Sequence, residues 1–194
     1  MDKISYGLGL SLGQQLKSSG VKELAYADLA AGIQDMLEGN QPKVSFQEAQ
    51  QAINTFFAEL EEKASVAAKA AGEAFLAENA KRPGVKVTAS GLQYEVLDAT
   101  IGQKRKATDT VRVHYEGTLP DGTVFDSSYK RGEPISFPLN GVIAGWTEGL
   151  QLMSVGSKYK LFIPYHLGYG ERGAGASIPP YSALIFTVEL LGIE

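Results

Sequence analysis

Residues 110–128 read TVRVHYEGTLPDGTVFDSS, and this stretch decides how the second half of the chain folds. Its first part alternates, because Val111, Val113 and Tyr115 stand between polar residues. A period of two is typical of a β-strand with one buried and one wet face. A tight-turn segment, PDGT, follows at residues 120–123, and the strand pattern then resumes. The stretch therefore predicts an antiparallel pair of strands.

Similar strand patterns recur through the rest of this half. The six expected strands are Leu92–Leu97, Thr110–Thr118, Val124–Ser127, Ile135–Leu139, Lys158–Ile163 and Leu184–Leu191. Among them, helical spacing joins Val142, Ile143, Trp146 and Leu150. A sheet with one wet face needs an apolar cover for the other, and one short helix can supply it. The prediction is an α+β domain with an antiparallel β-sheet wrapped around a short helix.

The chain changes character near Pro83. Between Ser45 and Lys81 there is no proline and a single glycine. Apolar residues recur there at intervals of three and four, and Ser45 with Glu48 has the pattern of a capping box. We therefore expect one amphipathic helix of ~35 residues, ~50 Å long, part of which stands clear of any small module. The apolar residues that lie on one face of this expected helix are Phe46, Ala49, Ile53, Phe56, Leu60, Ala64, Ala67, Ala71 and Ala74.

Two shorter helices are expected before it, at residues 5–17 and 23–38. A Ser-Ser-Gly segment separates them, and Gly-Asn-Gln-Pro closes the second. Helices this small bury little surface alone, so we expect a homodimer through residues 1 to about 60. A monomeric helical cap on the second half of the chain is the alternative. The apolar residues available are Leu8, Leu12, Leu16, Leu29, Ile33, Met36, Leu37, Phe56 and Phe57.

Three parts follow from these patterns. Residues 1–44 form an all-helical dimerisation module. Residues 45–82 form the long helix, whose first half belongs to the dimer module and whose second half is a connector. Residues 83–194 form the β-rich domain.

Charge excludes one class of partner. Residues 1–80 carry 6 basic and 11 acidic residues, and residues 81–194 carry 12 and 11, so neither half is strongly basic. The densest basic cluster, Lys104-Arg105-Lys106, has the composition of a solvated turn. A nucleic-acid partner needs a concentrated basic face, so none is expected.

Composition also bounds the chemistry and the compartment. With no cysteine, the chain has no disulfide, thiolate nucleophile or Cys-ligated metal. The opening MDKISYG lacks the basic start and apolar stretch of a secretory signal, and no run approaches the ~20 apolar residues of a membrane span. We expect a cytoplasmic protein with no membrane association.

The sequence contains few of the ordinary catalytic or cofactor motifs. His114 lies on a wet strand face and His166 lies in a loop, and neither has a second ligand at metal spacing. The segment GYGERG at 168–173 matches the dinucleotide pattern, but the chain soon reaches Pro179 and Pro180, where no helix would follow. We expect no cofactor and no metal.

An apolar and aromatic set with a few polar neighbours remains. Part of it is ordinary core, but the segment from Pro164 to Ser182 exceeds the ~12–15 residues usual for structureless loops. This segment carries Tyr165, Tyr169, Ile178 and Tyr181, and we expect it to be a wall of a pocket. The whole set is Tyr115, Phe125, Asp126, Phe137, Val142, Ile143, Trp146, Tyr169 and Phe186.

Five motifs carry a family resemblance. They are VHYEG at 113–117, DGTVFDSS at 121–128, VIAGWTEG at 142–149, MSVG at 153–156 and IPP at 178–180. In order and spacing they resemble the FKBP immunophilins, prolyl isomerases that bind macrolides. Residues 1–80, with softer patterns such as YGLG at 6–9, resemble the helical dimerisation module of the bacterial subgroup that includes the macrophage infectivity potentiator proteins.

The resemblance implies a peptidyl-prolyl cis-trans isomerase at residues 83–194, with a pocket between the short helix and the concave face of the sheet. Trp146 would form the floor, and the backbone N–H of Ile143 would hold a substrate carbonyl. Catalytic roles are implied for Tyr115, Phe125, Asp126, Ile143, Trp146, Tyr169 and Phe186. Contacts to substrate or macrolide are implied for Ile135, Phe137, Val142, Ile178 and Arg131, the last paired with Asp126 or packed at the rim.

The chain departs from the family pattern at three places. Ile135 stands where an aromatic residue is usual, and Ala174 and Ser177 replace larger loop residues. The segment before Val142 is also two residues shorter. These changes bear on macrolide affinity and on the preference for the residue before proline, since lost apolar contact is worth roughly 25 cal/mol per Å².

The implied partners are proline-containing peptides and partly folded proteins, with macrolides such as rapamycin or tacrolimus as inhibitors. Rotation about an X-Pro bond needs no general base, which fits a pocket without an acid–base pair. Two pockets carried by long helices would make a folding catalyst with chaperone-like client binding, and removing residues 1 to about 80 would then spare peptide isomerisation and impair protein refolding. The alternatives are a peptide-binding module with vestigial catalysis and a purely structural dimer.

Overall fold

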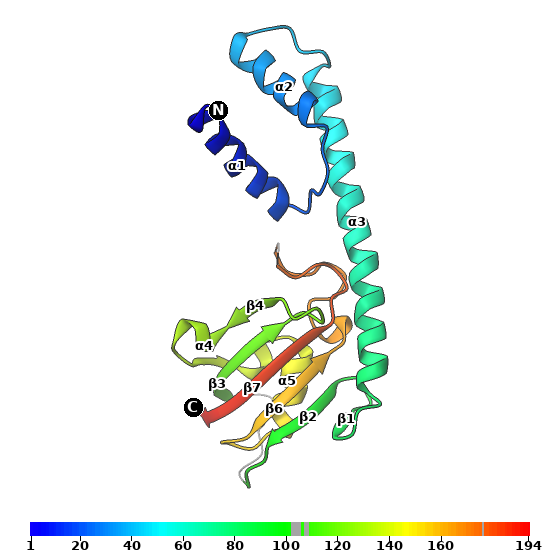
Figure 1. Ribbon diagram of the computed structural model, residues 1–194. Helices are drawn as coiled ribbons and strands as arrows, with labels where there is room; N and C mark the ends of the chain where they lie inside the picture. The colour runs from blue at the N-terminus through cyan, green and yellow to red at the C-terminus, as the bar shows by residue number, and fades with distance from the viewer. Residues whose placement is uncertain (102–105, 107–108, 176) are drawn as a thin grey trace. The chain divides into compact units, whose positions relative to one another are not determined.

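The computed structural model describes residues 1–101, 106, 109–175 and 177–194 (Figure 1). Lys104 and Arg105 lie outside the described residues, so the structure does not test the expected solvated turn there. The chain divides into two compact units, Met1–Lys63 and Ala64–Glu194.

The first unit is helical. It contains α1 (Lys3–Ser18), α2 (Tyr26–Glu38) and the beginning of α3 (Phe46–Asn79), close to the predicted limits. Oδ2 of Asp2 accepts a hydrogen bond from the Ser5 N–H at 2.7 Å and caps α1. Gly39 ends α2 in the left-handed conformation, with φ of 71°, which costs glycine little.

The predicted capping box at the start of α3 is confirmed. The Ser45 N–H donates to Oε2 of Glu48 at 2.9 Å, and the Glu48 N–H donates to Oγ of Ser45 at 3.2 Å. Two backbone donors that a helix start leaves unpaired are thereby satisfied. The local sequence therefore determines where α3 begins.

The first unit buries little of its own apolar surface. Neither α1 nor α2 contains a buried residue. Large apolar side chains on all three helices are instead exposed, among them Leu8, Leu29, Ile33, Met36, Leu37, Phe56 and Phe57.

The second unit is built on an antiparallel sheet. Its strand order is β1-β2-β6-β7-β3-β4, and β5 also pairs with β3. The strands are β1 (Val85–Val87), β2 (Gln93–Asp98), β3 (Thr110–Thr118), β4 (Val124–Ser127), β5 (Ile135–Pro138), β6 (Lys158–Ile163) and β7 (Leu184–Ile193). The six predicted strands are confirmed within two residues at each end, and β1 was not predicted.

The turn between β3 and β4 has the predicted form. The Gly122 N–H donates to the Leu119 carbonyl and the Leu119 N–H donates to the Thr123 carbonyl, both at 2.9 Å. Gly122 has a φ of 88°, which suits glycine at a tight turn. After β4 the chain forms a short unpredicted helix, α4 (Ser128–Arg131).

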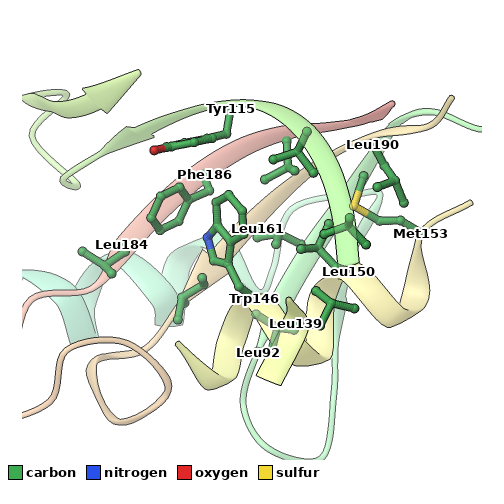
Figure 2. Close-up of a cluster of buried hydrophobic side chains, with 14 of the residues drawn as sticks. Leu92, Tyr115, Leu139, Trp146, Leu150, Met153, Leu161, Leu184, Phe186 and Leu190 are labelled. Atoms are coloured by element: carbon green, nitrogen blue, oxygen red, sulfur yellow. The ribbon is translucent and has the colours of Figure 1, made fainter. Parts of the chain in front are cut away.

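Helix α5 (Ala144–Leu152) covers one face of the sheet. It approaches β6 through two glycines, since a Cβ on Gly145 would lie 2.5 Å from Cγ2 of Ile163 and one on Gly149 would lie 2.7 Å from Cδ1 of Leu161. Between helix and sheet lies the core (Figure 2), which includes Leu92, Val111, Val113, Leu139, Trp146, Leu150, Met153, Leu161, Leu184, Phe186, Val188 and Leu190.

The last turns of α3 pack on the opposite face. Phe162 points away from α5, because side chains alternate along β6, and its ring lies 6.0 Å from that of Phe75. Asn79 donates to Gln93 at 2.8 Å, and both side chains are buried. The limits 1–44, 45–82 and 83–194 stay predictions, but the expected connector also covers part of the sheet. No helix in the described part of the chain is long and apolar enough to span a bilayer.

Candidate active site

A cavity of about 480 Å³ opens at the edge of the core, bounded by the sheet, α5 and the segment 164–182, here called the cavity loop. All of the predicted site residues except Arg131 line it. The lining consists of Tyr115, Phe125, Asp126, Ile135, Phe137, Gly141, Val142, Ile143, Trp146, Tyr169, Ala174, Ser177, Ile178 and Phe186.

The floor of the cavity is the indole of Trp146, which is 4% exposed. Three rings surround it, with centroid distances of 5.1 Å to Tyr115, 5.2 Å to Phe137 and 5.0 Å to Phe186. The Tyr115 and Phe186 rings meet the indole nearly edge to face (Figure 2), an arrangement that aromatic pairs favour. The result is a closely packed apolar surface at the bottom of the cavity.

Gly117 makes room for two of the walls. A Cβ at this position of β3 would lie 2.6 Å from the Phe125 ring and 2.7 Å from the Phe186 ring. The two rings pack nearly perpendicular to each other, with centroids 5.4 Å apart. Gly117 belongs to the VHYEG motif at 113–117, but the sequence predicts no role for it. The only available signal was a glycine at a buried position of an alternating strand.

One polar network stands at the rim. The Tyr115 hydroxyl and the Arg131 guanidinium both donate to the Asp126 carboxylate. Arg131 also donates to the Tyr115 hydroxyl at 3.0 Å and lies over its ring. Of the two positions expected for Arg131, the structure shows the pairing with Asp126, and Arg131 itself does not line the cavity. Arg131 is carried by α4, whose first turn is capped by Ser127.

The network holds both titratable groups in one state near neutral pH. Burial raises the pKa of Tyr115, and the hydrogen bond to Asp126 adds to the rise. Partial burial opposes ionisation of Asp126, but the hydrogen bonds from Tyr115 and Arg131 outweigh it and lower the pKa of that carboxyl. Tyr115 is therefore neutral and Asp126 is ionised, so neither exchanges a proton readily at neutral pH.

Two donors at α5 have no hydrogen-bond partner among the described residues. Ile143 stands at the N-cap of α5, and its backbone N–H has no hydrogen-bond partner among the described residues. The indole N–H of Trp146 is buried and likewise unpaired within the described part of the chain. A buried unpaired donor is costly. Ile143 lines the cavity, so its N–H is the donor that a carbonyl bound there could meet.

The cavity loop supplies the outer wall. Ala174 and Ile178 exchange backbone hydrogen bonds, and the loop returns at Gly173, where φ is 65° and a Cβ would clash with the Ile178 carbonyl. Ile178 is buried, whereas Tyr169 is 41% exposed at the rim, like Ile135 at 40%. The GYGERG segment belongs to this loop and opens no helix.

The two histidines take part in other contacts. Nδ1 of His114 lies 2.9 Å from Oγ of Ser128, and its ring stacks on Tyr129. Nε2 of His166 lies 3.0 Å from the Ser90 carbonyl oxygen. Among the described residues, no three His, Cys, Asp or Glu side chains gather as metal ligands would.

Comparison with protein families places both halves. Residues 102–191 match the family described as FKBP-type peptidyl-prolyl cis-trans isomerase. Residues 1–96 match the domain found amino-terminal to FKBP-type peptidyl-prolyl isomerases. Together the two matches span almost the whole chain.

Individual relatives agree. The FKBP-type 22 kDa peptidyl-prolyl cis-trans isomerase of Escherichia coli (strain K12) is 53% identical over 97% of this chain and 93% of its own length. The outer membrane protein MIP of Legionella longbeachae is 42% identical over 100% of this chain and 85% of its own. The crystal structure of FkpA from Escherichia coli matches with a TM-score of 0.74 at 43% identity, covering 99% of this chain and 95% of that one.

Proposed function

The chain belongs to the family of FKBP-type peptidyl-prolyl cis-trans isomerases, and we propose that the cavity above Trp146 is where its reaction takes place. The observation that carries this assignment is the buried indole enclosed by three aromatic rings, together with the Ile143 N–H, which has no hydrogen-bond partner among the described residues.

The geometry suits rotation about an X-Pro bond. The barrier of ~18–20 kcal/mol is the loss of amide resonance, so no σ bond breaks and no general base is needed. The planar amide is more dipolar than the twisted one, so an apolar pocket penalises the ground state more than the transition state. When the proline ring packs on Trp146, the amide lies in these apolar surroundings and water is excluded.

The polar groups of the site add differential binding. The Ile143 N–H can donate to a substrate carbonyl and hold it as the amide twists, which favours the transition state if the bond tightens there. Asp126 stays ionised beside the cavity because Tyr115 and Arg131 hold it. Its role in this proposal is to position Tyr115 and to set the local field, not to move a proton.

The test is the rate at which a short Leu-Pro-Phe peptide converts from cis to trans, with and without rapamycin. The proposal expects acceleration that rapamycin abolishes, because the macrolide would occupy the same cavity. It further expects Trp146→Leu to lower turnover by a larger factor than it weakens peptide binding. Peptide binding without any acceleration would instead favour a binding module with vestigial catalysis.

We further propose that the chain acts as a homodimer through residues 1–60 and holds folding clients between two isomerase units. Support comes from the exposed apolar side chains of α1, α2 and early α3, which a second copy would cover. Client capture by two sites would raise the local concentration of prolines near each cavity. The predicted cytoplasmic location rests on the sequence alone.

A further inference from the structure

A smaller cavity of about 270 Å³ lies within the Ala64–Glu194 unit, between α3 and the base of the cavity loop. The base is here the pair of loop ends that carry Tyr165 and Tyr181. Lys69, Gly72 and Leu76 of α3 line one side, and Tyr165 and Tyr181 line the other. The residues here play no part in the proposed chemistry. They do connect the helix to the loop that forms the outer wall of the active site.

The contacts between helix and loop are close. Nζ of Lys69 lies 5.3 Å from the centroid of the Tyr181 ring and 5.8 Å from that of Tyr165. The two rings meet edge to face at 5.2 Å. A Cβ on Gly72 would lie 3.0 Å from Cβ of Ala183 and 3.2 Å from its backbone nitrogen, so the helix approaches as closely as a glycine permits. Lys69, which lies over two rings, and Gly72, which contacts Ala183, together hold α3 against this base.

The two tyrosines close the loop. The Gly170 N–H donates to the Tyr165 carbonyl, and the Tyr181 N–H donates to the Gly170 carbonyl, both at 2.9 Å. Tyr181 has a φ of 60°, which is unfavourable for a residue with a large side chain and persists only where surrounding contacts hold it. Between these residues the loop carries Tyr169 and Ile178 into the active-site cavity. Contacts that hold Tyr181 therefore also hold the outer wall.

We propose that Lys69 and Gly72 of α3 position the cavity loop for the isomerase reaction. Lys69 is a positioning residue that acts through the Tyr165 and Tyr181 rings, and Gly72 allows the helix to reach them. On this proposal the functional isomerase unit begins at about residue 64, and removing residues 1 to about 80 should impair peptide isomerisation instead of sparing it. Such a cut would delete the helix turns that hold the loop. The inference rests on the proposed function, since the loop matters only if the cavity is the active site.

The first experiment compares Lys69→Met with Lys69→Arg in the full chain, using a tetrapeptide that contains Leu-Pro-Phe. Lys69→Met should raise KM roughly two- to fivefold, the factor expected for losing a partly exposed cation–π contact. Its kcat should change less than its KM, because Trp146 and the rings around it belong to α5 and the sheet, and of the predicted site residues only Tyr169 and Ile178 are carried by the loop. Lys69→Arg keeps the positive charge over the rings and should therefore keep the KM of wild type. The control Lys63→Met removes the same charge from the same helix and should leave KM at the wild-type value. Equal KM for Lys69→Met and wild type would overturn the proposal.

The second experiment measures amide hydrogen exchange at Gly170 and Tyr181, whose N–H groups close the loop. Both amides should exchange faster in Lys69→Met and in Gly72→Leu than in wild type, while core amides of β3 keep their protection. This readout needs no activity, so it separates the two ideas. A wild-type chain that does not accelerate peptide isomerisation would contradict the proposed function. Unchanged amide exchange in Lys69→Met would contradict the positioning role alone. Should Gly72→Leu fail to fold, Lys69→Met still decides.

Discussion

At the residue scale, the active-site cavity depends on Gly117, because only a residue without a side chain leaves room for the rings that form two of its walls. Gly117 lies on β3 where the Phe125 and Phe186 rings converge, and both rings would be within 2.7 Å of a Cβ there. The rings in turn form the walls next to Trp146. An interior at native density leaves no room for another carbon, so any larger residue must displace them.

We expect Gly117→Ala to lower kcat/KM for a proline tetrapeptide by about tenfold, because ring shifts of a fraction of an ångström disturb the apolar walls. Overpacking should also destabilise the fold by ~1–3 kcal/mol. Peptide kinetics and thermal unfolding measure the two effects. Gly192→Ala is the matched control, since this glycine of β7 has open space at its Cβ position. Similar activity in both variants would contradict the role assigned to Gly117.

The Asp126 network predicts a pH dependence of stability. Its folded-state pKa lies below the unfolded value, so its pairing contributes stability above the unfolded pKa and loses it as the pH falls through the folded pKa. Asp126→Asn should therefore unfold at a lower temperature than wild type at pH 7, and the difference should shrink below about pH 4. Thermal unfolding from acid to neutral pH checks this. The effect is modest because both side chains of the pair are partly exposed. A difference that stays constant with pH would contradict it.

At the element scale, α5 reaches the sheet through glycines spaced four residues apart. Gly145 and Gly149 lie on the same face of the helix and meet Ile163 and Leu161 of β6. Close approach brings Trp146 of α5 against Tyr115 of β3 and Phe186 of β7. The position of the pocket floor is therefore a property of helix packing and not of the tryptophan alone.

Gly145→Ala tests this packing. In an open helix the change would gain up to ~1 kcal/mol of stability, but here the new methyl meets the buried, branched Ile163, so a net loss of ~1–2 kcal/mol is expected. Gly32→Ala in α2 is the contrasting case, because nothing lies near its Cβ position, and it should stabilise its helix. Urea unfolding followed by far-UV circular dichroism measures both. A stabilised Gly145→Ala would show that α5 can retreat from β6 at no cost.

At the scale of the whole molecule, the two units differ in how they are stabilised. The Ala64–Glu194 unit has a continuous core between α5 and the sheet, whereas α1 and α2 contribute no buried residue to the Met1–Lys63 unit. Apolar helix faces left in water are unfavourable by roughly 25 cal/mol per Å² relative to burial. A second copy of the chain is the partner proposed to cover them.

Replacing both Leu29 and Ile33 with Glu places two charges on an exposed apolar face of α2. We expect this variant to sediment as a monomer, while the tetrapeptide kcat/KM stays within about twofold of wild type because the cavity is untouched. Catalysis of a proline-limited protein refolding reaction should fall by about tenfold or more as avidity is lost. The control Gln14→Glu with Gln15→Glu adds the same charge at polar positions of α1. A dimer that survives the apolar substitutions would exclude this face from the interface.

Part of the fold was predictable because its signals are local. The alternation of Val111, Val113 and Tyr115 predicts β3 with its observed limits, and the box of Ser45 and Glu48 predicts the start of α3. Strand β1 and helix α4 were missed because three or four residues carry no readable period. β1 exists because it pairs with β2, and α4 because Ser127 caps it and Gly132 ends it.

The residues at and around the site also divide into those that the sequence indicates and those that it does not. Contiguous motifs placed Tyr115, Asp126 and Trp146 in one cavity, because a family resemblance carries residues that keep their spacing. No such signal marks the contact of Lys69 with Tyr165 and Tyr181, which lie about a hundred residues further along the chain.

By itself, the sequence determined the long helix, the two shorter helices before it, α5 and six of the strands, and which aromatic residues could form the pocket. Periodicity, capping and turn formation act between residues a few positions apart, so they can be read along the chain. The tertiary structure alone decided how closely α5 and α3 approach the sheet, which rings Gly117 admits, and where the cavity loop is held. These features depend on free space between distant residues, and only close packing in three dimensions determines that space.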